Sequence, residues 1–211
     1  MLNKIKQGAL KASLVTVGIC ALYGLTSVEA LARGQLDITF DGDGVKKLIM
    51  PSVNSAMTSF YVYPDDRILL GAVDDRPNGF EIEMARLLSN GNFEPYFGNN
   101  TGKIGYSQTS APAMPDVFVN DFAVDVHRNI VSVGQATNYS DGYVFKFDRA
   151  GNPITFFSSG GQYALSTHTR VLPNYAIEVK GVAIQKDNKI LITGKMEDAS
   201  QSIFKTFVMR L

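Results

Sequence analysis

A short motif that begins with glycine occurs three times along the chain at nearly constant spacing. Its clearest copy is Gly-Gln-Leu-Asp-Ile-Thr-Phe at 34–40, and weaker copies begin at Gly91 and Gly151. The three glycines are 57 and 60 residues apart. Regular spacing is the usual sign of a repeat architecture, in which each unit is a small supersecondary element that buries its faces against its neighbours. The chain is therefore expected to fold as an array of similar units.

Two further features recur with the same period. A polar turn leads into an apolar run that opens with Ile68, Ile130 or Ile190, spaced 62 and 60 residues apart. Each unit then closes on a base followed by an apolar residue. These bases are Arg86, Lys146 and Arg210. Independent anchors with one period predict three units, which span residues 33–90, 91–150 and 151–211.

The local pattern inside each unit predicts β-strands. Runs rich in β-branched and aromatic residues meet polar turns containing Asp or Asn, which tolerate the positive backbone angles of tight hairpins. Hairpin strands are expected at 60–63 and 68–72, 122–126 and 130–134, and 182–185 and 190–194. A third strand is expected at 80–87, 143–147 and 204–211, and a fourth, less regular one at 45–50, 103–107 and 162–165. The middle strands are apolar on both faces, as in stacked sheets of a propeller.

These patterns resemble the delta-60 repeat, a propeller-type unit of exported bacterial proteins. The resemblance rests on the motif at 34–40, the Asp-Asn-Lys-Ile-Leu-Ile run at 187–192 and the Arg-Leu strand end, and it covers 34–211. The middle copy departs from the pattern at 94–96 and 127–128. The resemblance implies an all-β fold of three four-stranded units, arranged as a partial propeller or an arc. It implies no particular reaction or ligand.

The first 32 residues have the composition of a secretory signal peptide. Three lysines within the first eleven residues precede an apolar run over 12–26, which is short for a membrane span of about 20 residues. Ala30-Leu31-Ala32 then offers small residues for cleavage, so the mature chain is expected to begin at Arg33. An uncleaved anchor is the alternative. Export to the periplasm, the cell surface or the medium is expected, with no membrane span in the mature chain.

Composition disfavours several classes of function. Twenty basic and twenty acidic residues give no net charge, so nucleic acid is not an expected partner. The only cysteine, Cys20, lies in the apolar leader, which leaves the mature chain without a disulfide or a cysteine-bound metal. The sequence contains no phosphate-binding loop and no nucleophile elbow. We expect no cofactor.

Two patterns are candidates for metal binding. The run Asp41-Gly42-Asp43-Gly44 has the alternating carboxylates of a calcium loop, but the corresponding turns at 98–102 and 158–161 lack the acids. A structural turn is therefore favoured. Asp121, Asp125 and His127 could form a metal cluster or an acid–base pair. The matching turns carry Asp65 and Asp187, so His127 is interpreted as a turn residue, and His168 as part of a solvated connector.

Other candidates concern recognition. The bases Arg86, Lys146 and Arg210 could form a basic ring for an anionic ligand. The favoured alternative is that each pairs with an acid of the next unit or reaches water. The units differ most in the connectors 107–115 and 166–175, which are either recognition loops or tolerated insertions.

The sequence thus predicts an exported, non-catalytic binding or interaction module. One alternative is a carboxylate-dependent hydrolase or lyase on a propeller scaffold, which clustering of acids at one mouth of the fold would favour. Those acids are Asp37, Glu94, Asp121 and Asp148. The other is a structural component of a cell-envelope assembly. Because the end units of an array leave one face uncovered, we expect either a homo-oligomer, with two chains closing a six-unit ring, or a protein partner.

Overall fold

The computed structural model describes most of the chain after residue 34 and divides into two compact units, 1–46 and 47–211. The described residues are 35–50, 55–76, 79–106, 117–137, 141–158, 161–165, 175–198 and 203–211. The predicted signal peptide lies outside them, as do Cys20, His168, the connector 107–115 and all of 166–175 except Tyr175. In the first unit, residues 38–44 form successive turns.

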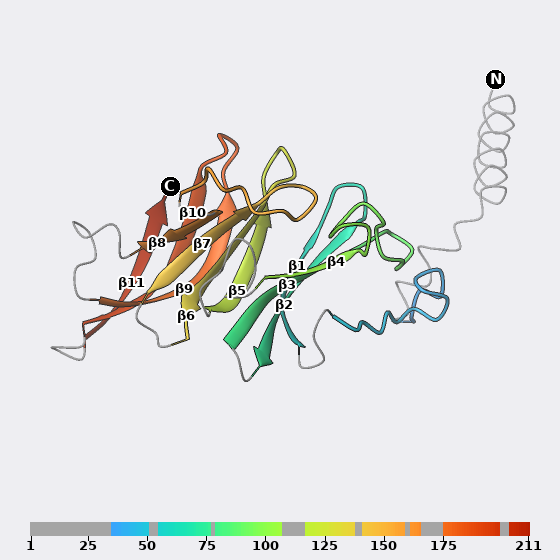
Figure 1. Ribbon diagram of the computed structural model, residues 1–211, viewed down its shortest axis with the longest axis horizontal. Helices are drawn as coiled ribbons and strands as arrows, with labels where there is room; N and C mark the ends of the chain where they lie inside the picture. Colours follow the sequence, from blue (N-terminus) through green and yellow to red (C-terminus); the bar gives the residue numbers. More distant parts are fainter. Residues whose placement is uncertain are drawn as a thin grey trace, which may run out of the picture. The chain divides into compact units, whose positions relative to one another are not determined.

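Eleven strands form three antiparallel sheets within the described part of 47–211 (Figure 1). The first sheet contains β1 (Ser55–Val62), β2 (Ile68–Arg76), β3 (Gly79–Leu87) and β4 (Lys103–Tyr106), in that order. The second contains β5 (Val117–Val124), β6 (Ile130–Ala136), β7 (Gly142–Phe147) and β8 (Gln162–Ala164), also in order. The third contains β9 (Tyr175–Ile184), β10 (Ile190–Asp198) and β11 (Ile203–Arg210), with β10 in the middle. The predicted all-β fold is confirmed.

Each sheet begins with a hairpin at the predicted place. Its turn contains one residue with positive φ, at Asp66 (61°), Arg128 (66°) and Asn188 (66°). Asp and Asn adopt this conformation more readily than other residues with a side chain, whereas a long side chain such as Arg seldom does. Residue preference therefore accounts for the first and third turns and leaves Arg128 to be explained.

The fourth strand of a sheet follows a copy of the glycine-led motif. In both cases, β4 and β8, it pairs with the strand that precedes the motif, β3 or β7. The motif therefore joins the third and fourth strands of one sheet. A fourth strand therefore belongs to the sheet that precedes its motif. Two predictions are wrong: no strand forms over 45–50, and the third sheet has three strands in the described residues. A β-strand needs a partner, and the described residues ahead of 45–50 include none.

The second sheet packs against the first through one face and against the third through the other. One buried cluster combines side chains of the first two sheets: Leu69, Ile82 and Met84 with Phe122, Phe145 and Phe147. The other combines side chains of the last two: Val131, Val133 and Val144 with Ile177, Val179 and Ile192. The strands β6 and β7 are thus covered on both faces, as predicted for the apolar middle strands of each unit, whereas β10, the middle strand of the third sheet, leaves Thr193 and Lys195 exposed.

Candidate functional sites: two end sheets and an arginine-lined cavity

Each end sheet has apolar side chains exposed on one face. In the first sheet Phe60 is 68% exposed, whereas Phe122, which occupies the corresponding place in β5, is 5% exposed. In the third sheet Val208 is 73% exposed, whereas Val144, its counterpart in β7, is fully buried. Side chains that are buried where sheets stack inside the chain are therefore open to solvent at its two end sheets.

The turn before residues 45–50 has the same geometry as the turns that lead into β4 and β8. A glycine with positive φ stands directly before each segment, at Gly44 (83°), Gly102 (73°) and Gly161 (87°). A Cβ on these glycines would meet the same motif position each time, at 2.7 Å from Leu36, 2.5 Å from Phe93 and 3.2 Å from Pro153. Only glycine fits so close to this position without displacing it. Residues 45–50 thus leave their turn as the two fourth strands do.

Packing after that turn is similar as well. Met50, six residues after Gly44, is buried against Ala72 and Ala85 of the first sheet, and Tyr106 of β4, four residues after Gly102, stacks on Phe147 of the second sheet. The strand that would pair with 45–50 corresponds to β3 and β7, and its counterpart in the third sheet is β11. Whereas β3 and β7 pair on both edges, β11 pairs with β10 alone in the described part of the chain. Among the described residues, then, the segment 45–50 is not part of a sheet, and the outer edge of β11 has no neighbouring strand.

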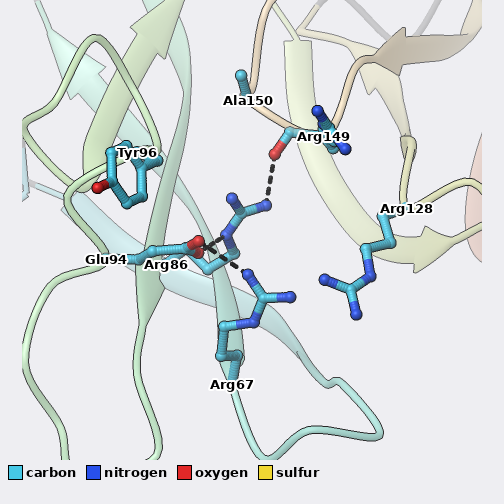
Figure 2. A pocket seen from close by; sticks show the side chains of 7 residues that line it. All are labelled: Arg67, Arg86, Glu94, Tyr96, Arg128, Arg149 and Ala150. Carbon is cyan, nitrogen blue, oxygen red and sulfur yellow. Dashed lines mark hydrogen bonds and ion pairs between the residues drawn. The ribbon is translucent and has the colours of Figure 1, made fainter.

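A cavity of about 440 Å³ lies where turns of the first and second sheets meet (Figure 2). Its lining comes from the β1–β2 turn (Arg67), the end of β3 (Arg86), the motif after β3 (Glu94, Tyr96), the β5–β6 turn (Arg128) and the turn after β7 (Arg149, Ala150). Four of these seven residues are arginines and one is an acid. The wall of the cavity is therefore strongly basic.

Arg86 and Glu94 form the buried part of this wall and are only 4% and 6% exposed. Nε of Arg86 donates a hydrogen bond to Glu94, and Nη1 donates to the carbonyl oxygen of Arg149 at 2.5 Å. The guanidinium also lies over the ring of Phe97, 4.5 Å from its centroid. Arg86 also lies beside Tyr63, with its guanidinium carbon 5.8 Å from the centroid of that ring. Burial raises the pKa of the Tyr63 hydroxyl, and the Arg86 guanidinium opposes this shift through hydrogen bonding and charge. The buried guanidinium is thus shared among Glu94, Arg149 and Tyr63.

Two carboxylates connect three of the arginines. Nη1 of Arg67 donates to Glu94 at 2.8 Å, and Nη2 of Arg67 donates to Oδ2 of Asp65 at 2.8 Å. Nη2 of Arg128 donates to the same Asp65 oxygen at 3.0 Å. The hydrogen bond from Arg67 is the main reason that the pKa of Asp65 falls to about 2. Asp65 is therefore ionised at neutral pH and holds two guanidinium groups close together.

The positive charge of the cavity is only partly balanced. Four arginines face two carboxylates, Glu94 and Asp65. The guanidinium of Arg149 has no hydrogen-bond or ion-pair partner among the residues that the structure describes, and Figure 2 shows it at the upper rim beside Ala150. The arginines exceed the acids by two charges.

The conformation of Arg128 is imposed by its turn. Asp125 is buried and accepts hydrogen bonds from the backbone nitrogens of His127 at 2.9 Å and Asn129 at 2.8 Å. The turn fixes a positive φ at residue 128 whatever side chain stands there. An arginine at this place adds backbone strain that the other two hairpins avoid.

The predicted metal candidates have local partners. Asp41 pairs with Lys46 at 2.7 Å, and Asp43 accepts a hydrogen bond from the backbone nitrogen of Val45 at 2.8 Å. The side chain of His127 is exposed at its turn. Within the described residues no group of three or more His, Cys, Asp or Glu side chains is placed to hold a metal ion.

Each of the four candidate catalytic acids binds protein groups of its own. Asp37 accepts from Thr39, and Asp148 accepts from Ala150 and Asn152. Glu94 is bound by Arg67 and Arg86, while Asp121 is bound by Ser59 and Val182.

The three recurring bases lie on three different sheets and do not form a ring. Arg86 pairs with Glu94, an acid of the next predicted unit, as the favoured alternative predicts. Lys146 pairs with Asp125 of its own unit at 3.4 Å. Arg210 is exposed on the third sheet. Of the three, only Arg86 lines the cavity.

Sequence reasoning did not identify the cavity, although one signal for it was present. The middle copy departs from the repeat pattern at 94–96 and 127–128. Three cavity residues, Glu94, Tyr96 and Arg128, lie at those positions. Departures of one copy from its neighbours therefore mark the wall of the cavity.

Searches against protein-family models, curated proteins and solved structures give no match to this chain. Among the described residues, no helix has the length and apolar character needed to cross a membrane.

Proposed function

We propose that the chain is an exported, non-catalytic interaction module built from propeller-type repeats of the delta-60 kind, and that a second copy completes its end sheets. The observation that carries this proposal is that, among the described residues, the segment 45–50 is not part of a sheet and the outer edge of β11 has no neighbouring strand. The segment 45–50 needs a neighbouring strand, and the outer edge of β11 can accept one. Two copies placed head to tail would form this pairing twice.

In this pairing, residues 45–50 of one copy add to β11 of the other, as β4 adds to β3 and β8 adds to β7. Backbone hydrogen bonds along the added strand supply affinity, and they remove an edge that would otherwise invite uncontrolled pairing. The exposed faces around Phe60 and Val208 come together as the stacked faces do within one chain. Contacts of this kind at both ends close a ring of six sheets, within the range of about four to eight found in propellers.

The two alternatives have less support. A carboxylate-dependent hydrolase or lyase needs acids that face one substrate, whereas each of the four candidate acids is bonded to protein groups of its own. A structural role in a cell-envelope assembly would use the same exposed faces with a different partner. A protein that stays monomeric in the following experiment would favour this alternative.

Light scattering across a dilution series of the mature protein tests the pairing. We expect twice the chain mass at micromolar concentration, and a single chain for Ile49→Pro, which removes a strand N–H, and for Val208→Asp, which charges the end face. Phe156→Asp is the matched control, because Phe156 is 91% exposed in a turn, and it should stay paired. A wild-type protein that remains a soluble monomer across the dilution series contradicts closure by a second copy.

Export is tested separately by intact-mass measurement on protein recovered from the medium and the cell envelope. We expect a chain that begins at Arg33. A chain that retains residues 1–32 in a membrane fraction would instead indicate an uncleaved anchor.

A further inference from the structure

We infer that the arginine-lined cavity binds a small organic oxyanion, either a carboxylate or a phosphate ester. Both kinds of ligand present oxygen atoms that accept hydrogen bonds from guanidinium groups. The site lies within one chain and does not depend on pairing between copies. Its volume of about 440 Å³ falls within the range of roughly 300–1,000 Å³ typical of small-molecule pockets.

The buried arginine is the first argument. Burial of a guanidinium is unfavourable unless its donors are satisfied, and Arg86 is only 4% exposed. Glu94 and the carbonyl of Arg149 accept hydrogen bonds from Nε and Nη1, and the Tyr63 hydroxyl also interacts with this guanidinium, which lines the cavity. An oxyanion in the cavity would accept a further hydrogen bond from Arg86, and in a partly desolvated site a charge-assisted bond of this kind is strong.

The arrangement of like charges is the second argument. Arg67 and Arg128 come from different sheets, yet both lie within 3.0 Å of Oδ2 of Asp65. In Figure 2 the guanidinium groups of Arg67 and Arg128 point toward one another across the space beside Arg86. Guanidinium groups held this close repel one another unless anions compensate them. Asp65 and Glu94 compensate two of the four charges, and a bound oxyanion would compensate the remainder.

The residues that differ from the repeat supply the third argument. Arg128 occupies a positive-φ position where Asp66 and Asn188 stand in the other hairpins. The turn requires a positive φ but does not require an arginine, because Asp or Asn would adopt that φ with less strain. Backbone strain of this kind tends to occur where a side chain has a function. Tyr96 is 79% exposed at the rim, and its ring offers a surface for the organic part of the ligand. A regular scaffold has thus been altered where an anion would enter.

Titration calorimetry at constant ionic strength tests the site with three probes: inorganic phosphate, phenyl phosphate and citrate. We expect saturable binding of at least one probe with a Kd below about 1 mM, and tighter binding of phenyl phosphate than of inorganic phosphate if the ring of Tyr96 contacts the ligand. Preference for citrate would identify a carboxylate ligand, and preference for the phosphates a phosphate ester.

Two variants separate binding from folding. Arg149→Gln removes a guanidinium that has no partner among the residues described, and Arg128→Asn replaces the strained arginine with a residue that tolerates positive φ. Each should weaken binding about tenfold, as loss of a charge-assisted hydrogen bond would, and Arg128→Asn should not lower the melting temperature. Lys186→Gln is the charge-matched control on an exposed turn of the third sheet, and it should bind as the wild type does.

Absence of binding by all three probes would overturn the inference. So would binding that all three variants weaken equally, because that result would reflect the overall charge of the protein. The variant Val208→Asp should bind normally whether or not it pairs, which keeps this result independent of the proposed pairing between copies.

Discussion

The ring of Phe122 in β5 lies directly over the backbone of Gly71 in β2, so that a Cβ on Gly71 would overlap the ring carbons. The first two sheets therefore approach each other closely at this point. In the next interface the corresponding residues are Val182 and Val133, which belong to one core cluster. A large residue over a small one in the first case is thus replaced by two residues of medium size.

Gly71→Ala should destabilise the protein by roughly 1–3 kcal/mol, because the core is close-packed and the ring must move. Adding Phe122→Val should recover part of this loss, since the pair then approaches the medium-sized pair of the second interface. Denaturant unfolding of both single variants and the double variant measures the coupling. Simple additivity of the two losses would show that the contact does not set the spacing of the sheets.

Asp121 connects all three sheets. It accepts hydrogen bonds from the hydroxyl of Ser59 in β1 at 2.7 Å and from the backbone nitrogen of Val182 in β9 at 3.0 Å. It follows a β-bulge at Asn120, and bulges occur at the same place in β1 and β9. The bulge turns the carboxylate toward both neighbouring sheets.

Asp121→Ala should therefore lower the free energy of unfolding by about 2–3 kcal/mol, the scale for lost hydrogen bonds to a charged group. Ser59→Ala should cost less, because it removes one donor and leaves the others in place. Thermal or urea unfolding of the two variants gives the comparison. Equal effects would mean that the link to β9 contributes nothing.

The buried pair Arg86 and Glu94 predicts a strongly non-additive result. Glu94→Ala leaves the guanidinium of Arg86 buried without its carboxylate, which typically costs about 3–5 kcal/mol. Replacing both, as Arg86→Met with Glu94→Ile, should restore most of that stability, since the next unit has Ile154 at the place of Glu94. Urea unfolding tests this, and a double variant no more stable than Glu94→Ala would refute it.

Asp125 predicts a dependence of stability on pH. Burial acts to raise the pKa of its carboxyl, but hydrogen bonds from Asn129 and His127, together with Lys146, outweigh burial and leave the pKa below its ordinary value of 3.8. A pKa lowered by folding means that the native state favours the ionised form. The resulting stability is fully present above the unfolded pKa of about 3.9 and is lost as the pH falls through the folded value.

Asp125→Asn should thus be less stable than the wild type at pH 7 and should lose less stability on acidification. The two unfolding curves should converge as the pH falls below the unfolded pKa and through the lower folded pKa of Asp125. Chemical denaturation at a series of pH values provides the measurement. Parallel curves for the two proteins would show that this carboxylate does not contribute to acid sensitivity.

The sequence predicts the local features of this fold well. The hairpins are found at their expected places because turn residues and apolar runs act over a few neighbouring residues, as at Asp66 and Asn188. The burial of both faces of β6 and β7 can likewise be predicted from the sequence, because these strands are apolar on both faces.

Features that depend on distant partners are not predicted. Residues 45–50 have the turn and the packing of a fourth strand, but strand formation depends on a neighbour that local sequence does not specify. The cavity requires contacts such as that of Arg86 with Arg149, 63 residues apart. Its charges are ordinary as single residues, and only the folded arrangement brings them together.

The three hairpin turns allow a direct comparison of three residues at one structural position within a single molecule. The same turn is made with Asp66, Arg128 and Asn188, under the same solvent conditions and within one continuous chain. The first and third turns share a short polar residue, Asp or Asn, which is what folding of this turn requires. The second turn has a long basic side chain instead, which folding does not require. Comparing copies in this way separates selection for shape from selection for use, and here it needs no second protein.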